Sequence, residues 1–140
     1  MSDSVFRRVH RIRKTEEHRA RQAHRQAHDV QATCEAEVVQ LHEAMEQSHA
    51  SSQGHAGWLA HHHSYVLRAE MSRRTAEAAL QQANTAVLRA RTEVVSRSVD
   101  ARTVELLAES LEEQIEQEHR QAEQRDLDEV GTQRYARQAS

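Results

Sequence analysis

The chain has 140 residues, of which 37% are hydrophobic and 29% are charged, but only 3% are aromatic and none is proline. A compact core in a chain of this length normally needs more large apolar side chains, so the composition predicts long helices packed along a narrow seam. A net charge of only -3, together with apolar residues that recur at regular spacing, argues against a disordered chain.

Membrane and secretory segments are not expected. No stretch approaches the roughly 20 consecutive apolar residues that a membrane span requires. Residues 1–6 lead into charged residues and not into the apolar core of a signal peptide. Cys34 is the single cysteine, which fits a reducing compartment. The sequence therefore predicts a cytoplasmic protein with no direct membrane insertion.

Residues spaced alternately three and four apart predict a first helix over about residues 4–50, with Asp3 or Ser4 as its cap. This is the spacing of a coiled-coil seam. The expected seam positions are Val5, Val9, Ile12, Glu16, Arg19, Ala23, Val30, Glu37 or Val38, Leu41, Met45 and Ser48.

A bend is predicted at residues 51–57. This segment contains Gly54 and Gly57 beside small polar residues, and glycine both weakens a helix interior and tolerates turn conformations. The bend would fold the chain into an antiparallel coiled-coil hairpin, a single all-α domain over residues 1–140.

A second, longer helix is predicted over about residues 58–130, followed by a frayed tail at 131–140 that begins with Gly131. The first helix would pair with it only back to about Val104, so residues from about 105 onward would have no partner in the hairpin. An exposed apolar stripe there indicates a docking surface. The expected second seam is Leu59, His62, Val66, Ala69, Ala76, Leu80, Ala83, Val87, Ala90, Val94, Ala101, Val104, Ala108, Leu111, Ile115 and Ala122.

Catalytic and metal-binding motifs are not found. The chain has no GxGxxG, HExxH or CxxC pattern. His61, His62 and His63 project about 100° apart on a helix and cannot all face one metal ion. His24 and His28 lie one turn apart but lack a third ligand in the sequence. We therefore expect no enzyme activity, no cofactor and no metal.

Charge is distributed unevenly along the chain. Arginines in the first 25 residues, with others in 86–104, predict a basic collar at the open end of the hairpin, whereas 105–140 is acidic. A basic helix can bind nucleic acid, but no aromatic residues interleave with these arginines for base stacking. The collar is therefore interpreted as a docking surface for an acidic protein, and nucleic acid is not an expected partner.

The layout resembles the stalk proteins of bacterial type III export systems, FliJ in flagella and the YscO-like proteins of injectisomes. The shared features are the chain length, the shorter first helix, and Trp58 and Tyr65 just after the bend. The most specific match is the stretch EQEHRQAEQRDLDEV at 116–130, which resembles the family's Glu-rich helix ending in an apolar-Asp-Glu-apolar step. Gly131 departs from the pattern, because the family more often continues the helix with alanine.

The resemblance implies a stalk that is monomeric alone, that binds and stimulates a hexameric type III export ATPase, and that couples this ATPase to the membrane export gate. Secretion chaperones are further implied partners, at a location on the inner-membrane export apparatus. The ATPase-binding residues would be Arg7, Arg11, Arg89, Arg97, Leu111, Ile115, Leu127, Asp128, Glu129 and Val130. The gate-binding residues would be Leu41, Met45, Trp58 and Tyr65. A generic coiled-coil scaffold or homodimer is the alternative.

Overall fold

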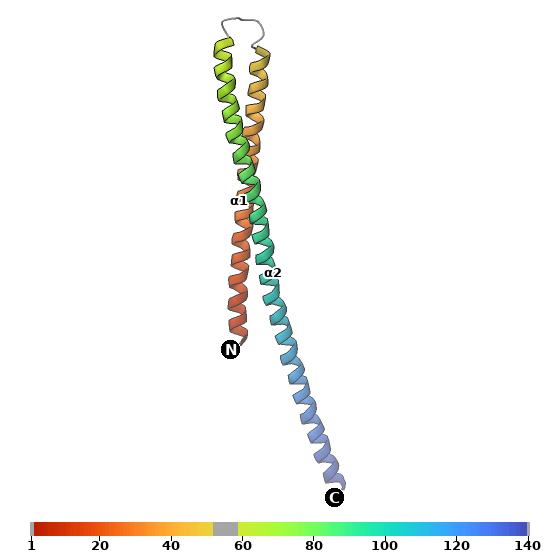
Figure 1. Cartoon of the computed structure of the whole chain (residues 1–140). Helices are drawn as coiled ribbons and strands as arrows, with labels where there is room; N and C mark the ends of the chain where they lie inside the picture. Colours follow the sequence, from red (N-terminus) through yellow and green to blue (C-terminus); the bar gives the residue numbers. More distant parts are fainter. Residues whose placement is uncertain (1, 52–58, 140) are drawn as a thin grey trace. The chain divides into compact units, whose positions relative to one another are not determined.

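Two long α-helices form the protein. The computed structural model describes residues 2–51 and 59–139, with side chains at 4–49 and 61–139. Helix α1 spans Ser2–Ser51 and helix α2 spans Leu59–Ala139, and they pack against each other in a hairpin (Figure 1). The predicted all-helical class and the longer second helix are confirmed. Residues 52–57 of the predicted bend and Trp58 lie outside the described residues.

The chain divides into two compact units. Residues Met1–Lys14 and Val99–Ser140 make up the terminal unit, and Thr15–Ser98 make up the middle unit. In the middle unit the amide of Gln31 donates to Asn84 at 2.7 Å, and the rings of His49 and His62 lie 5.4 Å apart. Residue numbers on α2 therefore fall as those on α1 rise, so the two segments run antiparallel.

The terminal unit has the same antiparallel pairing. His10 Nε2 lies 3.0 Å from Glu105 Oε1, and Arg13 lies 3.8 Å from Asp100. Within this unit α2 continues well past the start of α1 (Figure 1).

Most buried and half-buried positions of α2 form one heptad series, with steps of three and four residues in alternation from His62 to Leu111. Half-buried residues beside this series are Glu70, Ala79, Ser98, Asp100 and Glu105. The series confirms the predicted seam from His62 to Leu111 and includes Arg73 and Arg97. Ile115 and Ala122 were also expected in the seam, but both are exposed because no segment of α1 covers them. In the described chain, every residue from 112 to 139 is exposed.

Helix α1 has the same periodicity, but the predicted register of its first half is wrong. Val5, Ile12 and Val30 are all more than half exposed. The covered series is Phe6, His10, Arg13, Glu17, Ala20, His24, Ala27, Gln31, Cys34, Val38, Leu41, Met45 and Ser48. The covered positions of α1 alternate by three and four residues all the way back from Val38, whereas the predicted positions before Val38 are each one residue earlier. A shift of one residue rotates a position by about 100° around the helix. The predicted seam therefore faces solvent before residue 38, although Val9 and Glu16 are half-buried at its edge.

The seam is thin. Among the described residues, its fully buried apolar side chains are Ala20, Ala76, Ala83, Val87 and Ala101. Alanine buries little apolar surface, so each seam layer contributes only a small hydrophobic free energy. Polar contacts between the helices consequently carry a large share of the specificity of pairing.

Helix α2 does not end near residue 130 as predicted. It continues through Gly131 to Ala139, with the Thr132 hydroxyl donating to the Asp128 carbonyl at 2.8 Å. Glycine in a helix interior costs roughly 1 kcal/mol relative to alanine. That cost does not end a helix when good helix formers follow and no proline is present.

Candidate functional site

The most exposed part of the described chain is the end of α2, residues 112–139, here called the C-terminal segment. It carries Leu127, Val130 and Tyr135, all exposed, and among the described residues of α1 Phe6 lies beside its first turns. Its acidic residues are Glu112, Glu113, Glu116, Glu118, Glu123, Asp126, Asp128 and Glu129, against four arginines. An exposed acidic helix with apolar side chains has the character of a protein-docking element.

Ion pairs one turn apart support this helix in the absence of packing. Arg120 pairs with Glu116, and His119 Nδ1 lies 3.3 Å from Glu123. The amide of Gln124 donates to Asp128 at 3.0 Å. Such pairs each stabilise an isolated helix by roughly 0.2–0.5 kcal/mol. Asp128 and Glu129 of the predicted ATPase site are exposed on this helix.

The predicted apolar stripe is two patches and not one. Leu111 and Ile115 are four residues apart and share a face, and Leu127 and Val130 are three apart and share another. An unbroken helix rotates about 100° per residue, which places Leu127 roughly 120° around the axis from Ile115. A partner that contacts both patches must therefore wrap around the helix or contact it from two sides.

The first patch belongs to an open groove in the terminal unit, where α1 begins. The groove measures about 380 Å³, and its apolar floor combines one residue of α1 with a face of α2. Its lining is Phe6, Ala108, Leu111, Glu112, Ile115, Glu116 and His119. Leu111 is half-buried, so pairing extends beyond the predicted limit at Val104. The reason is the register, because His10 lies opposite Glu105 and the residues before His10 cover a further turn and a half of α2.

The predicted basic collar has members in both units. Arg7 and Arg11 are exposed in the terminal unit, and Arg89 is exposed in the middle unit. Arg97 is half-buried and forms ion pairs with Glu16 at 3.2 Å and Glu93 at 2.8 Å. Arg97 thus stabilises helix pairing, which reduces its availability to a partner.

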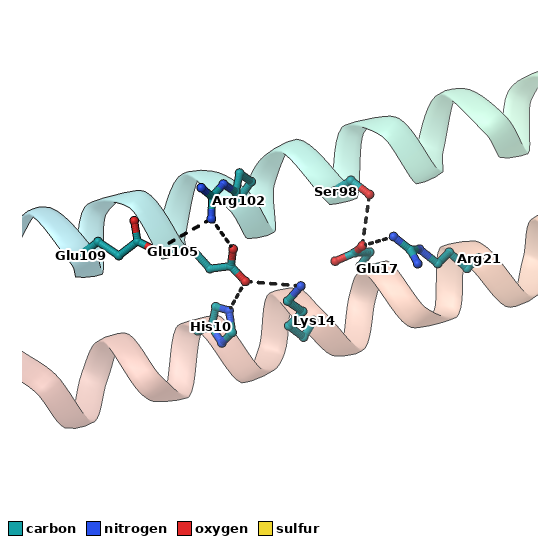
Figure 2. Close-up of polar contacts among 8 residues, drawn as sticks. All are labelled: His10, Lys14, Glu17, Arg21, Ser98, Arg102, Glu105 and Glu109. Atoms are coloured by element: carbon teal, nitrogen blue, oxygen red, sulfur yellow. Dashed lines mark hydrogen bonds and ion pairs between the residues drawn. The ribbon is translucent and has the colours of Figure 1, made fainter.

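Glu105 organises the polar contacts of the terminal unit (Figure 2). Its carboxylate lies 3.0 Å from His10, accepts from Arg102 at 3.0 Å and lies 3.4 Å from Lys14. These contacts, led by the hydrogen bond with His10, lower the pKa of Glu105 to about 2. The sequence did not indicate this cluster, because the acidic residues of α2 were expected beyond the part that pairs with α1.

A second carboxylate is buried in the middle unit (Figure 2). Glu17 is only 7% exposed, and its Oε1 accepts from Arg21 at 2.6 Å and from Ser98 at 3.2 Å. Buried carboxylates require such donors, because an unpaired one would be strongly destabilising. Glu17 and Glu105 are therefore structural acids that fix helix pairing.

The predicted gate residues differ in accessibility. Leu41 and Met45 are half-buried in the seam, Tyr65 is exposed, and Trp58 lies outside the described residues. Two apolar residues that the sequence analysis missed follow Tyr65 on α2: Leu67 is 54% exposed and Met71 is 70% exposed. In the sequence they could have been recognised as apolar residues at positions outside the seam.

Metal binding finds no support in the part of the chain that the structure describes, where no three His, Cys, Asp or Glu residues lie together as a ligand set. The His24 and His28 rings meet edge to face, 4.6 Å apart. Neither α1 nor α2, over its described residues, has a stretch long and apolar enough to cross a membrane.

The model of the family described as Flagellar FliJ protein matches residues 2–140, which is nearly the whole chain. No curated protein and no solved structure matches this sequence.

Proposed function

Because the chain belongs to the flagellar FliJ family of non-catalytic components of flagellar and type III protein export, we propose that it is a stalk of the export ATPase. In this role the chain binds and stimulates a hexameric ATPase and couples it to the membrane export gate. It acts in the cytoplasm, peripherally at the inner-membrane export apparatus, and binds secretion chaperones as further partners.

The observation that carries this proposal is the exposed C-terminal segment. Leu127 and Val130 are exposed at the end of α2, where every described residue from 112 to 139 is exposed. Burying one such side chain contributes about 1.5–3 kcal/mol, so several of them in one helix favour a binding surface. A single continuous helix is also a suitable shape for insertion into the central pore of a ring.

Electrostatic attraction would also contribute to binding of the ATPase. Arg7, Arg11 and Arg89 are exposed cations outside the C-terminal segment. Such charges would mainly raise the rate of association with an acidic pore lining, and salt would weaken the effect. Arg97 remains a candidate with a smaller contribution, because it also pairs with Glu16 and Glu93.

The gate contact is proposed for the part of the middle unit nearest the predicted bend. Tyr65, Leu67 and Met71 are exposed on α2. Leu41 and Met45 are half-buried and would act by supporting this surface from the seam. The predicted contact of Trp58 stays part of the proposal.

Point variants test the ATPase contact. Leu127→Glu with Val130→Glu should abolish stimulation of the type III export ATPase from the same organism. Leu88→Glu is a matched control, because Leu88 is 64% exposed and Leu127 is 67% exposed. Full stimulation by the Leu127/Val130 variant would refute the proposed contact.

The alternative function is a coiled-coil scaffold in which the C-terminal segment pairs with a second copy. The same exposed apolar residues favour the scaffold. The two functions differ in the molecular mass that they predict for the isolated chain in solution. Light scattering of the isolated chain at micromolar concentration separates the two functions, since the stalk should be a monomer and the scaffold a dimer.

A further inference from the structure

Helix α2 carries a second row of apolar residues within the middle unit, on the side away from the seam. Leu67, Met71, Leu88 and Val95 are each between 54% and 70% exposed. Single exposed apolar residues are common on protein surfaces. Four exposed apolar residues on one side of the same helix need a physical explanation.

The row has the spacing of a coiled-coil seam. The positions of this face advance by four and three in alternation, as do those of the covered seam of α2. They are Leu67, Met71, Arg74, Ala78, Gln81, Thr85, Leu88, Thr92 and Val95, so Arg74 and Gln81 are its polar members. At about 100° per residue the centre of this row lies roughly 150° from the centre of the covered seam. We call the part from Ala78 to Val95 the outer row; Leu67 and Met71 belong to the surface proposed for the gate.

The threonines in the outer row are apolar in effect. The Thr85 hydroxyl donates to the Gln81 carbonyl at 3.1 Å, and the Thr92 hydroxyl donates to the Leu88 carbonyl at 3.0 Å. Both hydroxyls are therefore satisfied within the helix. Their methyl groups extend the apolar surface of Leu88 and Val95.

The charge on both sides of the outer row has one sign. Arg89 and Arg91 are exposed at flanking positions, and no Asp or Glu occupies the row or its flanks between residues 78 and 98. Glu93 lies further around the helix and pairs with Arg97 at 2.8 Å. A shallow groove of about 620 Å³ runs along this face from Ala78 to Arg89.

We propose that the outer row binds an acidic amphipathic helix of a partner protein, which packs along α2 as a third strand. A helix is the occupant that fits a straight row with Leu88 and Val95 on one face of α2, because two helices pack side by side when apolar residues recur about every 3.5 residues on both. The exposed Arg89 and Arg91 select acidic residues beside its apolar stripe. This site is distinct from the C-terminal segment and from the surface proposed for the gate, and it shares only Arg89 with the cations proposed to attract the ATPase.

Two labelled synthetic peptides of about four heptads serve as probes, with Leu at both seam positions and either Glu or Lys at the flanking positions. Fluorescence anisotropy during titration with the full-length chain measures their affinities. The Glu peptide should bind at least about tenfold more tightly than the Lys peptide, a difference of about 1.4 kcal/mol. Equal affinity, or preference for the Lys peptide, would overturn the proposal.

Variants of the outer row localise the binding. Leu88→Glu with Val95→Glu should weaken binding of the Glu peptide at least about tenfold, and Arg91→Glu should reverse the preference between the peptides. Val39→Glu is the matched control, since Val39 is 53% exposed on α1 and should leave binding unchanged. Circular dichroism of each variant establishes that the helices persist.

Hydrogen exchange locates the bound peptide independently of substitution. Protection by the Glu peptide should centre on residues 85–95. Protection centred instead on the arginine-rich residues 7–25 would contradict the proposal, as would displacement of the peptide by self-association of the chain. Stimulation of the ATPase by the Leu88/Val95 variant should remain complete, so failure of this inference is distinguishable from failure of the proposed function.

Discussion

His10 on α1 and Glu105 on α2 lie 3.0 Å apart, between Nε2 and Oε1, and join the two helices of the terminal unit. Arg102 and Lys14 contact the same carboxylate, at 3.0 Å and 3.4 Å. The closest contacts of this unit are therefore polar, in keeping with a seam whose most buried apolar member is Ala101.

Glu105→Gln should lower the stability of the terminal unit at neutral pH. The pKa of Glu105 is lowered to about 2, mainly by the hydrogen bond with His10, so its ionised form favours the folded state. This contribution is complete above the unfolded pKa, roughly 4.3, and is lost as the pH falls toward 2. Thermal melts of the variant and the wild type should differ near neutrality and converge near pH 2.

Glu109→Gln is the control for that pH series. Glu109 is exposed and reaches Arg102 only at 3.9 Å. Its substitution should change the melting temperature far less. A constant difference between the Glu105→Gln variant and the wild type from pH 7 to pH 2 would contradict the assigned role of Glu105.

Arg73→Leu should raise the melting temperature of the middle unit. Arg73 occupies a seam position of α2, and its Nε is buried without a hydrogen-bond partner in the described structure. Its ion pairs with half-buried Glu70 and exposed Glu77 lie within α2 and do not join the two helices, whereas leucine would bury apolar surface in the seam between them. Arg74→Leu, at a highly exposed neighbouring position, should leave the melting temperature unchanged.

Gly131→Ala should stabilise the end of α2 locally by about 0.5–1 kcal/mol. The added Cβ would meet no atom within 4 Å, so the substitution removes the entropic cost of glycine without a clash. Slower amide exchange at residues 128–135 measures the effect. The reverse change, Ala122→Gly, should accelerate exchange around residue 122, and unchanged exchange in both variants would indicate that this segment is not helical in solution.

Substitutions at the proposed gate surface should separate binding from stability. Leu67→Glu with Met71→Glu alters two exposed side chains and should weaken gate binding while helix content is retained. Leu41→Ala and Met45→Ala alter half-buried seam residues, so each should cost about 1–2 kcal/mol of stability, less than a fully buried site. Gate binding that survives the Leu67/Met71 change would exclude this surface.

Periodicity was sufficient to predict the two helices and the covered face of α2, because a heptad repeat read over many turns tolerates local exceptions. The first half of α1 was placed one residue out of phase, since its covered positions include Glu17, His24 and Gln31 and its most apolar ones, such as Ile12, face solvent. Apolar character is a poor guide where polar contacts between helices decide the register.

Less of the candidate site than of the fold could be predicted from the sequence. The exposed end of α2 followed from the unequal helix lengths, although its start moved from about 105 to 112 because His10 pairs with Glu105. The Glu105 cluster depends on side-chain geometry that spacing does not specify. Leu67 and Met71 were not predicted, because they lie outside the seam positions from which the contacts of α2 were inferred.

The most direct test of the stalk role is ATP hydrolysis by the type III export ATPase from the same organism, measured against increasing concentrations of the full-length chain and of a chain that lacks residues 125–140. Residues 125–139 are all exposed, so the deletion should leave the paired helices intact by circular dichroism. The full-length chain should stimulate hydrolysis to saturation, and the truncated chain should leave the rate at that of the ATPase alone. Full stimulation by the truncated chain would contradict the assignment of ATPase binding to the C-terminal segment.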